Sequence, residues 1–333
     1  MITWLNAGFT GDNMVLLKVD GLSKWFSVRK GAFGKTFYVQ AVDNVSFELE
    51  KGEAVSLVGE SGSGKTTLGK TILRLYYPTK GKIIFDGKDI TNLKEKELKW
   101  YRRETGIVQQ DPFGSLAPHF TIYKILEEPL IVNKIGTREE RRERVYKALE
   151  EVGLPPGEFA FKYPHMLSGG QLQRVAIARA MILNPKLIIA DEPVSMLDAS
   201  VRVDVLNLFR ELQRKHEMSV IYITHDLSTT RYFSEKIFIM YAGHIVERAA
   251  TNEMLKNPRH PYTLALFSAI PDPDPENRLK LREVPPGEPP SLINPPKGCR
   301  FKPRCPFATS KCDEEPPEVE TTPGHWVKCW YPR

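Results

Sequence analysis

The chain has 333 residues, of which 41% are hydrophobic and 26% charged, a composition typical of a globular protein with one large domain and a smaller appendage. No apolar run reaches the ~18 residues of a membrane-spanning helix, and the N-terminus has no basic stretch followed by an apolar one, so neither a membrane span nor export is expected. The net charge of +6 is too small to distinguish an anionic cofactor, a nucleic acid or a membrane surface as a partner.

Taken in chain order, residues 1–13 show no periodicity and are expected to form an N-terminal arm. In residues 14–268, short apolar runs alternate with stretches of helical spacing, which predicts an α/β domain with a central sheet. Arg and Glu alternate at helical spacing in residues 138–147 and predict a solvent-exposed helix. Residues 271–296 contain nine prolines and predict an extended connector, so residues 269–333 are expected to form a connector and a small C-terminal extension.

A glycine-rich segment, GESGSGKT, follows the apolar run AVSLV and precedes TLGKTILRLY, which is the strand, loop and helix context of a phosphate-binding loop. Its glycines let backbone N–H groups point at phosphate oxygens, and the next helix turns its positive end to the same charge. Lys65 is placed to reach the β- and γ-phosphates, and Thr66 offers a hydroxyl to Mg²⁺. The residues expected to bind the nucleotide here are Gly59, Glu60, Ser61, Gly62, Ser63, Gly64, Lys65, Thr66 and Thr67.

The run KLIIADEP predicts a buried strand that ends in two carboxylates, Asp191 and Glu192. Ligands of parallel sheets lie at the carboxyl ends of the strands, so both acids are expected beside the phosphates. Asp191 is suited to hold Mg²⁺ through its water shell, and Glu192 to polarise the water that attacks the γ-phosphate. By itself this pattern is weak, because many such acids cap the next turn; beside the phosphate-binding loop it predicts nucleotide hydrolysis.

Many enzyme classes share the phosphate-binding loop, and the segment LSGGQ at residues 167–171 distinguishes among them. It resembles the signature motif of ABC ATPases, whose fold is a P-loop α/β domain with a helical subdomain, here expected at about residues 111–175. In that family Ser168, Gly169, Gly170 and Gln171 would bind the γ-phosphate of ATP held by the opposite subunit. The resemblance therefore implies that two chains pair on ATP. The alternative is an ordinary serine at a helix N-terminus.

Three further motifs of the ABC family occur in the expected order. Gln110, in QQDPFGSL, matches the glutamine that meets Mg²⁺ and the attacking water, and Gln109 is the alternative. Asp198 resembles the aspartate that crosses the dimer interface, although the family more often has Ala where this chain has Met196. His225, in YITHDL, resembles the histidine that would bond the γ-phosphate and hold the geometry of the attacking water.

An aromatic residue near the start of the domain stacks on adenine in this family. Phe26, in LSKWFSV, is the best match, with Trp25 and Tyr38 as alternatives. Nearby, the KGAFGK insertion at Lys30–Lys35 resembles the F-type member of the usual pair of ATPases in one branch of the family.

The tail of the chain resembles the C-terminal extension of the oligopeptide/dipeptide transporter ATPases, through His260, Pro261 and Tyr262 and a group of cysteines. In some members the equivalent cysteines carry a [4Fe–4S] cluster. Four thiolates are the right number and softness for one, whereas structural zinc sites use closer pairs than these, which are separated by five, six and sixteen residues. Zinc, disulfides and free thiols remain as alternatives. The expected ligands of the iron–sulfur cluster are Cys299, Cys305, Cys312 and Cys329.

The resemblance implies the ATP-hydrolysing subunit of an ABC importer, bound peripherally to the cytoplasmic face of the membrane. Its expected partners are a second ATPase, a paralogue rather than a copy, two transmembrane permease subunits and, through them, an extracytoplasmic substrate-binding protein; nucleic acid is not expected. Peptides are the first expected cargo, with oligosaccharides and metal complexes as alternatives. A soluble ABC ATPase of translation or DNA repair is disfavoured, because the chain holds a single cassette without a long insertion and its cysteines follow that cassette.

Overall fold

The computed structural model describes residues 14–29, 35–269 and 287–333. The predicted N-terminal arm, most of the Lys30–Lys35 insertion and the larger part of the proline-rich connector lie outside these residues. The strands are β1 (Val15–Arg29), β2 (Thr36–Glu50), β3 (Ala54–Val58), β4 (Lys80–Phe85), β5 (Lys88–Asp89), β6 (Thr105–Val108), β7 (Leu187–Asp191), β8 (Ser219–Thr224), β9 (Lys236–Tyr241), β10 (His244–Ala250), β11 (Glu318–Thr322) and β12 (His325–Lys328).

Helices lie between the strands along most of the chain. They are α1 (Lys65–Ile72), α2 (Lys99–Glu104), α3 (Pro112–Ser115), α4 (Ile122–Val132), α5 (Arg138–Glu151), α6 (Pro156–Phe159), α7 (Gly169–Met181), α8 (Ala199–Lys215), α9 (Leu227–Phe233), α10 (Thr251–Lys256) and α11 (Pro261–Ser268), with 3₁₀ turns η1 (Pro164–Met166), η3 (Lys302–Arg304) and η4 (Ser310–Asp313). The predicted α/β fold is confirmed.

An eight-stranded sheet forms the centre of the molecule, in the order β11-β12-β10-β9-β3-β8-β7-β6. Strands β9, β3, β8, β7 and β6 are parallel, and β10, β12 and β11 continue the sheet in antiparallel fashion. Every residue of β3, β7 and β8 is buried, as expected for parallel strands covered on both faces and rich in Val, Ile and Leu. The carboxyl ends of these strands carry the predicted nucleotide site.

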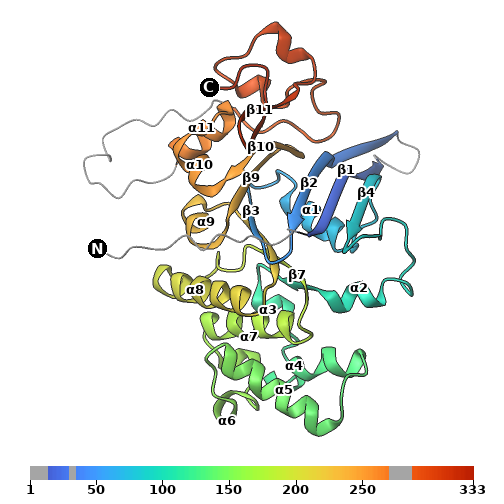
Figure 1. Cartoon of the computed structure of the whole chain (residues 1–333), viewed down its shortest axis with the longest axis vertical. Helices are drawn as coiled ribbons and strands as arrows, with labels where there is room; N and C mark the ends of the chain where they lie inside the picture. Colours follow the sequence, from blue (N-terminus) through green and yellow to red (C-terminus); the bar gives the residue numbers. More distant parts are fainter. Residues whose placement is uncertain (1–13, 30–34, 270–286) are drawn as a thin grey trace.

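A second, antiparallel sheet, β2-β1-β4-β5, lies beside the central one (Figure 1). One core fills the space between the two sheets, with Leu17 and Phe85 from the antiparallel sheet and Leu57 and Ile72 from β3 and α1. This packing fixes the phosphate-binding loop, which joins β3 to α1, against the antiparallel sheet.

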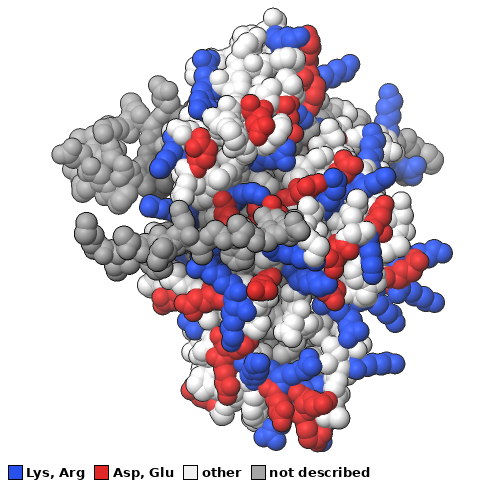
Figure 2. Space-filling model, viewed as in Figure 1, with Lys and Arg blue, Asp and Glu red and all other residues white. Residues whose placement is uncertain are grey.

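Between β6 and β7 the chain forms helices only, and α4, α5 and α6 make one end of the elongated molecule (Figure 1). Thr137 caps α5 in a reciprocal capping box with Glu140. Only Val145 and Leu149 of this helix are buried, which confirms the predicted solvent-exposed helix. On the face shown in Figure 2, Lys and Arg are interspersed with Asp and Glu over the whole length. None of the helices in the described ranges combines the length and apolarity needed to cross a membrane.

The cysteine-containing segment is joined to the central sheet. Strand β12 pairs with β10, at Glu247 with Val327 and Arg248 with Trp326, so the sheet continues across the predicted domain boundary at residue 268 (Figure 1). Phe301 is 1% exposed and packs against Tyr241 and Tyr262 of the large domain. The extension therefore shares a core with that domain.

Candidate functional site

The phosphate-binding loop closes tightly because its glycines leave no room for side chains. A Cβ on Gly59 would lie 2.1 Å from the carbonyl oxygen of Met240, and one on Gly64 would lie 2.1 Å from that of Ala41. Gly64 also has φ 105°, which L-residues rarely adopt. The Nζ of Lys65 donates to the carbonyl oxygen of Gly59 at 2.7 Å. The loop thus holds its lysine buried at the start of α1.

Two oxygen ligands for a hard cation lie beside this loop. Thr66 Oγ1, at the start of α1, donates to Asp191 Oδ1 at the end of β7 over 2.9 Å. Burial raises the pKa of Asp191, and the nearby Glu192 adds to the effect, whereas the Thr66 hydroxyl opposes it. A hydroxyl and a desolvated carboxylate at hydrogen-bond distance are the ligand types that Mg²⁺ uses in phosphate sites. The donor set therefore fits the magnesium ion predicted from the sequence.

Glu192 is the point where three predicted residues meet. Its Oε1 lies 3.0 Å from Nδ1 of His225, which follows β8, and its Oε2 accepts from Nε2 of Gln110 at 3.1 Å. The backbone at Glu192 has φ 46°, an uncommon conformation for a residue other than glycine and one that tends to occur at functional sites. A cavity of about 30 Å³, lined by Glu192 and His225, is large enough for one water molecule. The structure thus brings Glu192, His225 and Gln110 into contact.

The LSGGQ segment begins helix α7, which the chain holds apart from α1 (Figure 1). The exposed Ser168 caps this helix: its Oγ accepts from the Gln171 N–H at 3.4 Å, and Gln171 Oε1 accepts from the Ser168 N–H at 3.0 Å. A Cβ on Gly170 would lie 2.5 Å from Val201, so only glycine lets α7 approach α8. Asp198, before α8, is exposed and makes no capping hydrogen bond. The structure thus leaves Ser168 and Asp198 at the surface.

The three aromatic candidates for adenine differ in their contacts. The ring of Phe26 meets Tyr76 edge to face, with 5.3 Å between ring centroids. Trp25 instead donates its Nε1 hydrogen to Asp43 at 3.2 Å, and its ring lies 6.5 Å from that of Tyr38. Trp25 thus donates to a partly buried carboxylate, whereas the ring of Phe26 contacts Tyr76 and the Nζ of Lys24, 4.8 Å from its centroid.

The four cysteines come together. All of them line one narrow, apolar cavity in the extension, and His260, which is 1% exposed, lines it as well. His260 Nδ1 accepts from the Tyr262 N–H at 3.0 Å, and its Nε2 has no hydrogen-bond partner among the described residues. An orphaned donor beside four thiols is unusual in a buried site. Cys299, Cys305, Cys312 and Cys329 thus line one cavity, and their role as ligands of an iron–sulfur cluster stays a prediction.

Burial and mutual proximity both act on these thiols. Burial raises the pKa of Cys299 to about 11, and Cys329 and Cys312 add to this effect. The Tyr331 N–H points at the sulfur of Cys329 over 3.4 Å and opposes the rise in the pKa of that thiol which burial causes. In the part of the chain that the structure describes, no three His, Cys, Asp or Glu side chains are arranged to hold a metal ion.

Comparison with known proteins identifies the family. The model of the ABC transporter family matches residues 42–195, and the model described as oligopeptide/dipeptide transporter, C-terminal region, matches residues 246–312. A putative peptide import ATP-binding protein of Brucella ovis is 46% identical over 94% of this chain and 97% of its own length. The oligopeptide transport ATP-binding protein AppF of Bacillus subtilis is 48% identical over 94% of this chain and 96% of its own.

The chain belongs to the family of ABC transporter ATP-binding proteins. Among solved structures, the dimeric, post-hydrolysis state of the ATP-binding cassette MJ0796, bound to ADP and Pi, is 34% identical with a TM-score of 0.62. It covers 71% of this chain and 99% of its own length. The predicted ABC cassette fold and the ATPase activity are thereby confirmed.

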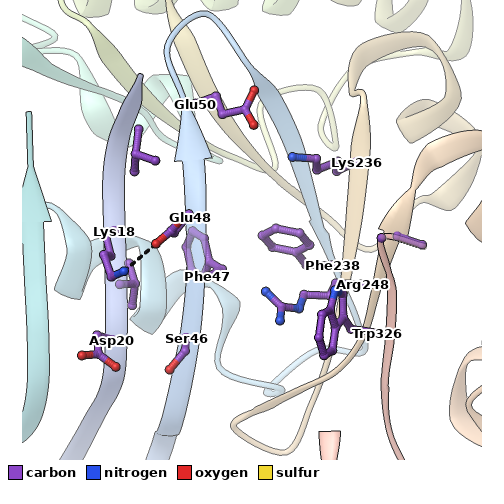
Figure 3. Close-up of a pocket in the computed structure, with 14 residues that line it drawn as sticks. Lys18, Asp20, Ser46, Phe47, Glu48, Glu50, Lys236, Phe238, Arg248 and Trp326 are labelled. Carbon is purple, nitrogen blue, oxygen red and sulfur yellow. Dashed lines mark hydrogen bonds and ion pairs between the residues drawn. The ribbon is translucent and has the colours of Figure 1, made fainter. Parts of the chain in front are cut away.

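The ABC cassette also contains a wider cavity, of about 490 Å³, between its two sheets (Figure 3). The rings of Phe47 and Phe238 meet there with 5.2 Å between centroids. No residue predicted to bind nucleotide lines this cavity. Its cations already pair with carboxylates: Lys18 with Glu48 at 2.6 Å, Lys236 with Glu53 at 2.7 Å and Arg248 with Glu318 at 3.0 Å. A triphosphate would therefore find few free cations here.

Two arginines of the ABC ATPase were not singled out from its sequence. Arg300, next to Cys299, donates to the carbonyl oxygen of Ala242 and the carboxylate of Asp43. Arg304, next to Cys305, donates to the carboxylate of Glu60 in the phosphate-binding loop. No local motif marks these contacts, since each joins residues more than 50 positions apart.

Proposed function

We propose that this ABC ATPase powers the import of oligopeptides or dipeptides. The proposal is carried by the match of its C-terminal region to the oligopeptide/dipeptide transporter model, together with relatives whose names include peptide import and oligopeptide transport. Its partners would be two transmembrane permease subunits, which receive an extracytoplasmic binding protein, and a second ATPase, at the cytoplasmic face of the membrane. Resemblance of the Lys30–Lys35 insertion to F-type subunits favours a paralogue as that second ATPase.

Uptake of labelled peptides tests this assignment. Cells lacking the chain should lose uptake of labelled di- or oligopeptides and regain it from a plasmid carrying the chain. The Glu192→Gln variant should restore no uptake. Unchanged peptide uptake in the deletion strain, with loss of oligosaccharide or metal-complex uptake instead, would contradict the peptide assignment.

For hydrolysis, we propose that Thr66, Asp191 and Gln110 surround Mg²⁺ while Lys65 binds the β- and γ-phosphates. When bound, the ion would neutralise the negative charge that develops on the phosphates as the bond to the γ-phosphate breaks. Glu192 would accept a hydrogen bond from the attacking water and direct the water oxygen at the γ-phosphorus. His225 would form a hydrogen bond with the γ-phosphate. Support comes from the 3.0 and 3.1 Å contacts that hold both oxygens of Glu192 in place.

For assembly, we propose that Ser168, Gly169, Gly170 and Gln171 of one chain bind the γ-phosphate held by its partner, and that Asp198 lies in the same interface. The exposed helix start at α7 and the exposed, uncapped Asp198 support this arrangement. The dimeric state of the MJ0796 cassette supports it as well. Phe26, which unlike Trp25 has no side-chain hydrogen bond to break, would stack on adenine.

Size-exclusion chromatography of the Glu192→Gln variant with Mg-ATP tests the assembly. The variant binds ATP but hydrolyses it slowly, so it should elute as a dimer with ATP and as a monomer without it. Adding Ser168→Gly should abolish that dimer, because glycine retains most of the helix-capping preference but lacks the hydroxyl. Persistence of the ATP-dependent dimer in the double variant would contradict the role of Ser168.

We also propose that Cys299, Cys305, Cys312 and Cys329 hold a [4Fe–4S] cluster. All four line one cavity, and backbone N–H groups directed at the sulfurs of Cys299, Cys305 and Cys329 would favour their thiolate forms. Four thiolates are the number and kind of ligand that such a cluster would take, whereas structural zinc sites generally use pairs of ligands closer in sequence than these cysteines.

Metal analysis of anaerobically purified protein decides between these ligands. Four irons per chain, with visible absorption that disappears on chelation, is the expected result. Cys312→Ser should lower the iron content, whereas Ser310→Ala, in the same 3₁₀ turn, should retain it. Stoichiometric zinc without iron, or thiols that all titrate freely with no metal, would contradict the cluster.

A further inference from the structure

Glu60, the second residue of the phosphate-binding loop, forms hydrogen bonds through its N–H, its carbonyl oxygen and its carboxylate. Its N–H donates to the hydroxyl of Tyr262 at 2.9 Å, and its carbonyl oxygen accepts from Nζ of Lys65 at 2.8 Å. Its two carboxylate oxygens accept from Nη1 of Arg304 at 3.0 and 3.2 Å. Glu60 is therefore, with Gly59, one of the residues that hold the lysine expected to bind the phosphates.

Arg304 and Tyr262, which hold Glu60 from outside the loop, each lie next in sequence to a residue that lines the cysteine cavity, Cys305 and Pro261 respectively. Arg304 ends the 3₁₀ turn η3 and directly precedes Cys305. Tyr262 lies two residues after His260, which lines the same cavity and caps helix α11. The ring of Phe301, another wall residue, packs against Tyr262 with 5.5 Å between centroids. A change in the shape of the cavity thus has two short routes to Glu60.

The ion pair between Arg304 and Glu60 is expected to contribute to the position of the loop. The side chain of Arg304 is 7% exposed and that of Glu60 is 32% exposed, so solvent screens the ion pair only in part. Nη1 of Arg304 also donates to the hydroxyl of Tyr241 at 3.4 Å. Hydrogen bonds between charged groups stabilise more than neutral ones, and loss of Glu60 would leave a buried guanidinium without its carboxylate.

We propose that Arg304 and Tyr262 are positioning residues for the phosphate-binding loop, which make ATP affinity depend on the integrity of the cysteine cavity. Neither residue touches the nucleotide; each acts through Glu60. The inference rests on the proposed binding of ATP at this loop. It assigns the extension a function in the ATPase cycle: when the cavity is filled and ordered, Glu60 is held and Lys65 faces the phosphates, and when the cavity collapses, the loop loosens.

Binding of ATP to the full chain tests the positioning role. Arg304→Gln, made in the Glu192→Gln background to prevent hydrolysis, should weaken ATP binding by about fivefold, within the range of couplings through packed networks. Arg304→Lys should recover part of the loss. Lys311→Gln is the matched control, because Lys311 also lies in a 3₁₀ turn of the extension but pairs with Glu314 and does not line the cavity. Equal ATP affinities of Arg304→Gln and the control would overturn the proposal.

Two further readouts separate positioning from general destabilisation. In a Glu60→Gln background, Arg304→Gln should cause a smaller additional loss of affinity, because the neutral amide accepts a weaker hydrogen bond from Arg304 than the carboxylate does. In hydrolysing protein, Arg304→Gln should raise KM and leave kcat within about twofold. If Arg304→Gln does not fold, Tyr262→Phe keeps the buried ring and should weaken ATP binding by about threefold. Full additivity with Glu60→Gln, or unchanged affinity in Tyr262→Phe, would contradict the proposal.

The dependence of ATP affinity on the cysteine cavity is tested by removing the proposed metal or one of the cysteines. Chelation of the metal, or the substitution Cys312→Ser, should weaken ATP binding when Arg304 is present. The same treatments should have little effect on ATP binding in the Arg304→Gln variant. If the chain holds no metal, the proposed cluster fails, but the effect of Arg304→Gln and Cys312→Ser on ATP affinity still tests this inference. If iron is present and ATP affinity is the same with and without it, this inference fails and the cluster stands.

Discussion

The nucleotide site and the cysteine cavity are built in different ways. At the nucleotide site, residues within short motifs follow neighbouring parallel strands, so the sheet itself brings Thr66, Asp191 and Glu192 together. At the cavity, four cysteines lie in loops and turns, and their surroundings come from α11 and the β12–β10 pairing. The chemistry of the first site depends on strands that are buried for other reasons, whereas the second depends on how the extension docks.

The largest expected effect is on catalysis. Glu192→Gln should lower ATP turnover by about 10²–10⁴-fold, the usual contribution of a positioned acid or base, with little change in unfolding temperature. Glu217→Gln is a suitable control, because Glu217 is an exposed glutamate with a similarly positive φ, 50° against 46°. Steady-state phosphate release checks the prediction. Turnover of Glu192→Gln within tenfold of the parent would show that the nucleotide site works through other residues.

The next effect concerns the docking of the extension. Phe301→Ala should cost about 3–5 kcal/mol of unfolding free energy, because it empties a fully buried ring position. Phe307→Ala should cost clearly less, since Phe307 is 42% exposed. Urea unfolding followed by tryptophan fluorescence measures both. Equal losses in the two variants would mean that the extension is not held by the shared core.

A smaller effect is expected from pH. Burial and the charges of Lys328 and Arg300 lower the pKa of His244 from 6.5 to about 4, against the opposing effect of Asp43 and Glu315. Protonation therefore favours the unfolded chain: stability is full above pH 6.5 and falls as the pH drops from 6.5 to 4. The loss is about 3 kcal/mol at pH 4.

Replacement of His244 isolates its contribution to the loss of stability at low pH. His244→Asn cannot titrate in this range, so its unfolding free energy should decline less between pH 6.5 and pH 4 than that of the parent. Parallel pH profiles of the two proteins would show that His244 does not couple the extension to acid stability.

The smallest effect is the cap of α7. Ser168→Ala should cost about 1 kcal/mol of stability, and Ser168→Gly only a few tenths. Both variants should fail to form the ATP-dependent dimer, although their unfolding temperatures differ. A dimer lost only in Ser168→Ala would indicate that helix capping, rather than the hydroxyl, governs pairing.

Much of the cassette could be predicted from the sequence. The runs AVSLV, KLIIAD and SVIYIT are strands, and the charged residues 138–147 lie in an exposed helix. These predictions succeeded because periodicity and motif spacing reflect local backbone geometry and the shared edge of a parallel sheet. The stacking of Phe26 on adenine, with Trp25 and Tyr38 as alternatives, stays a prediction, because it depends on side-chain contacts, which no spacing specifies.

The sequence by itself determined the chemistry of this protein: a loop for phosphate, carboxylates for a cation and water, and four thiols in one tail. Only the tertiary structure decided that the tail joins the central sheet and that Arg304 reaches Glu60, 244 residues away. The physical reason is that local motifs restrict the backbone over a few residues, whereas docking depends on the summed burial of side chains such as Phe301 and on strand pairing between distant segments.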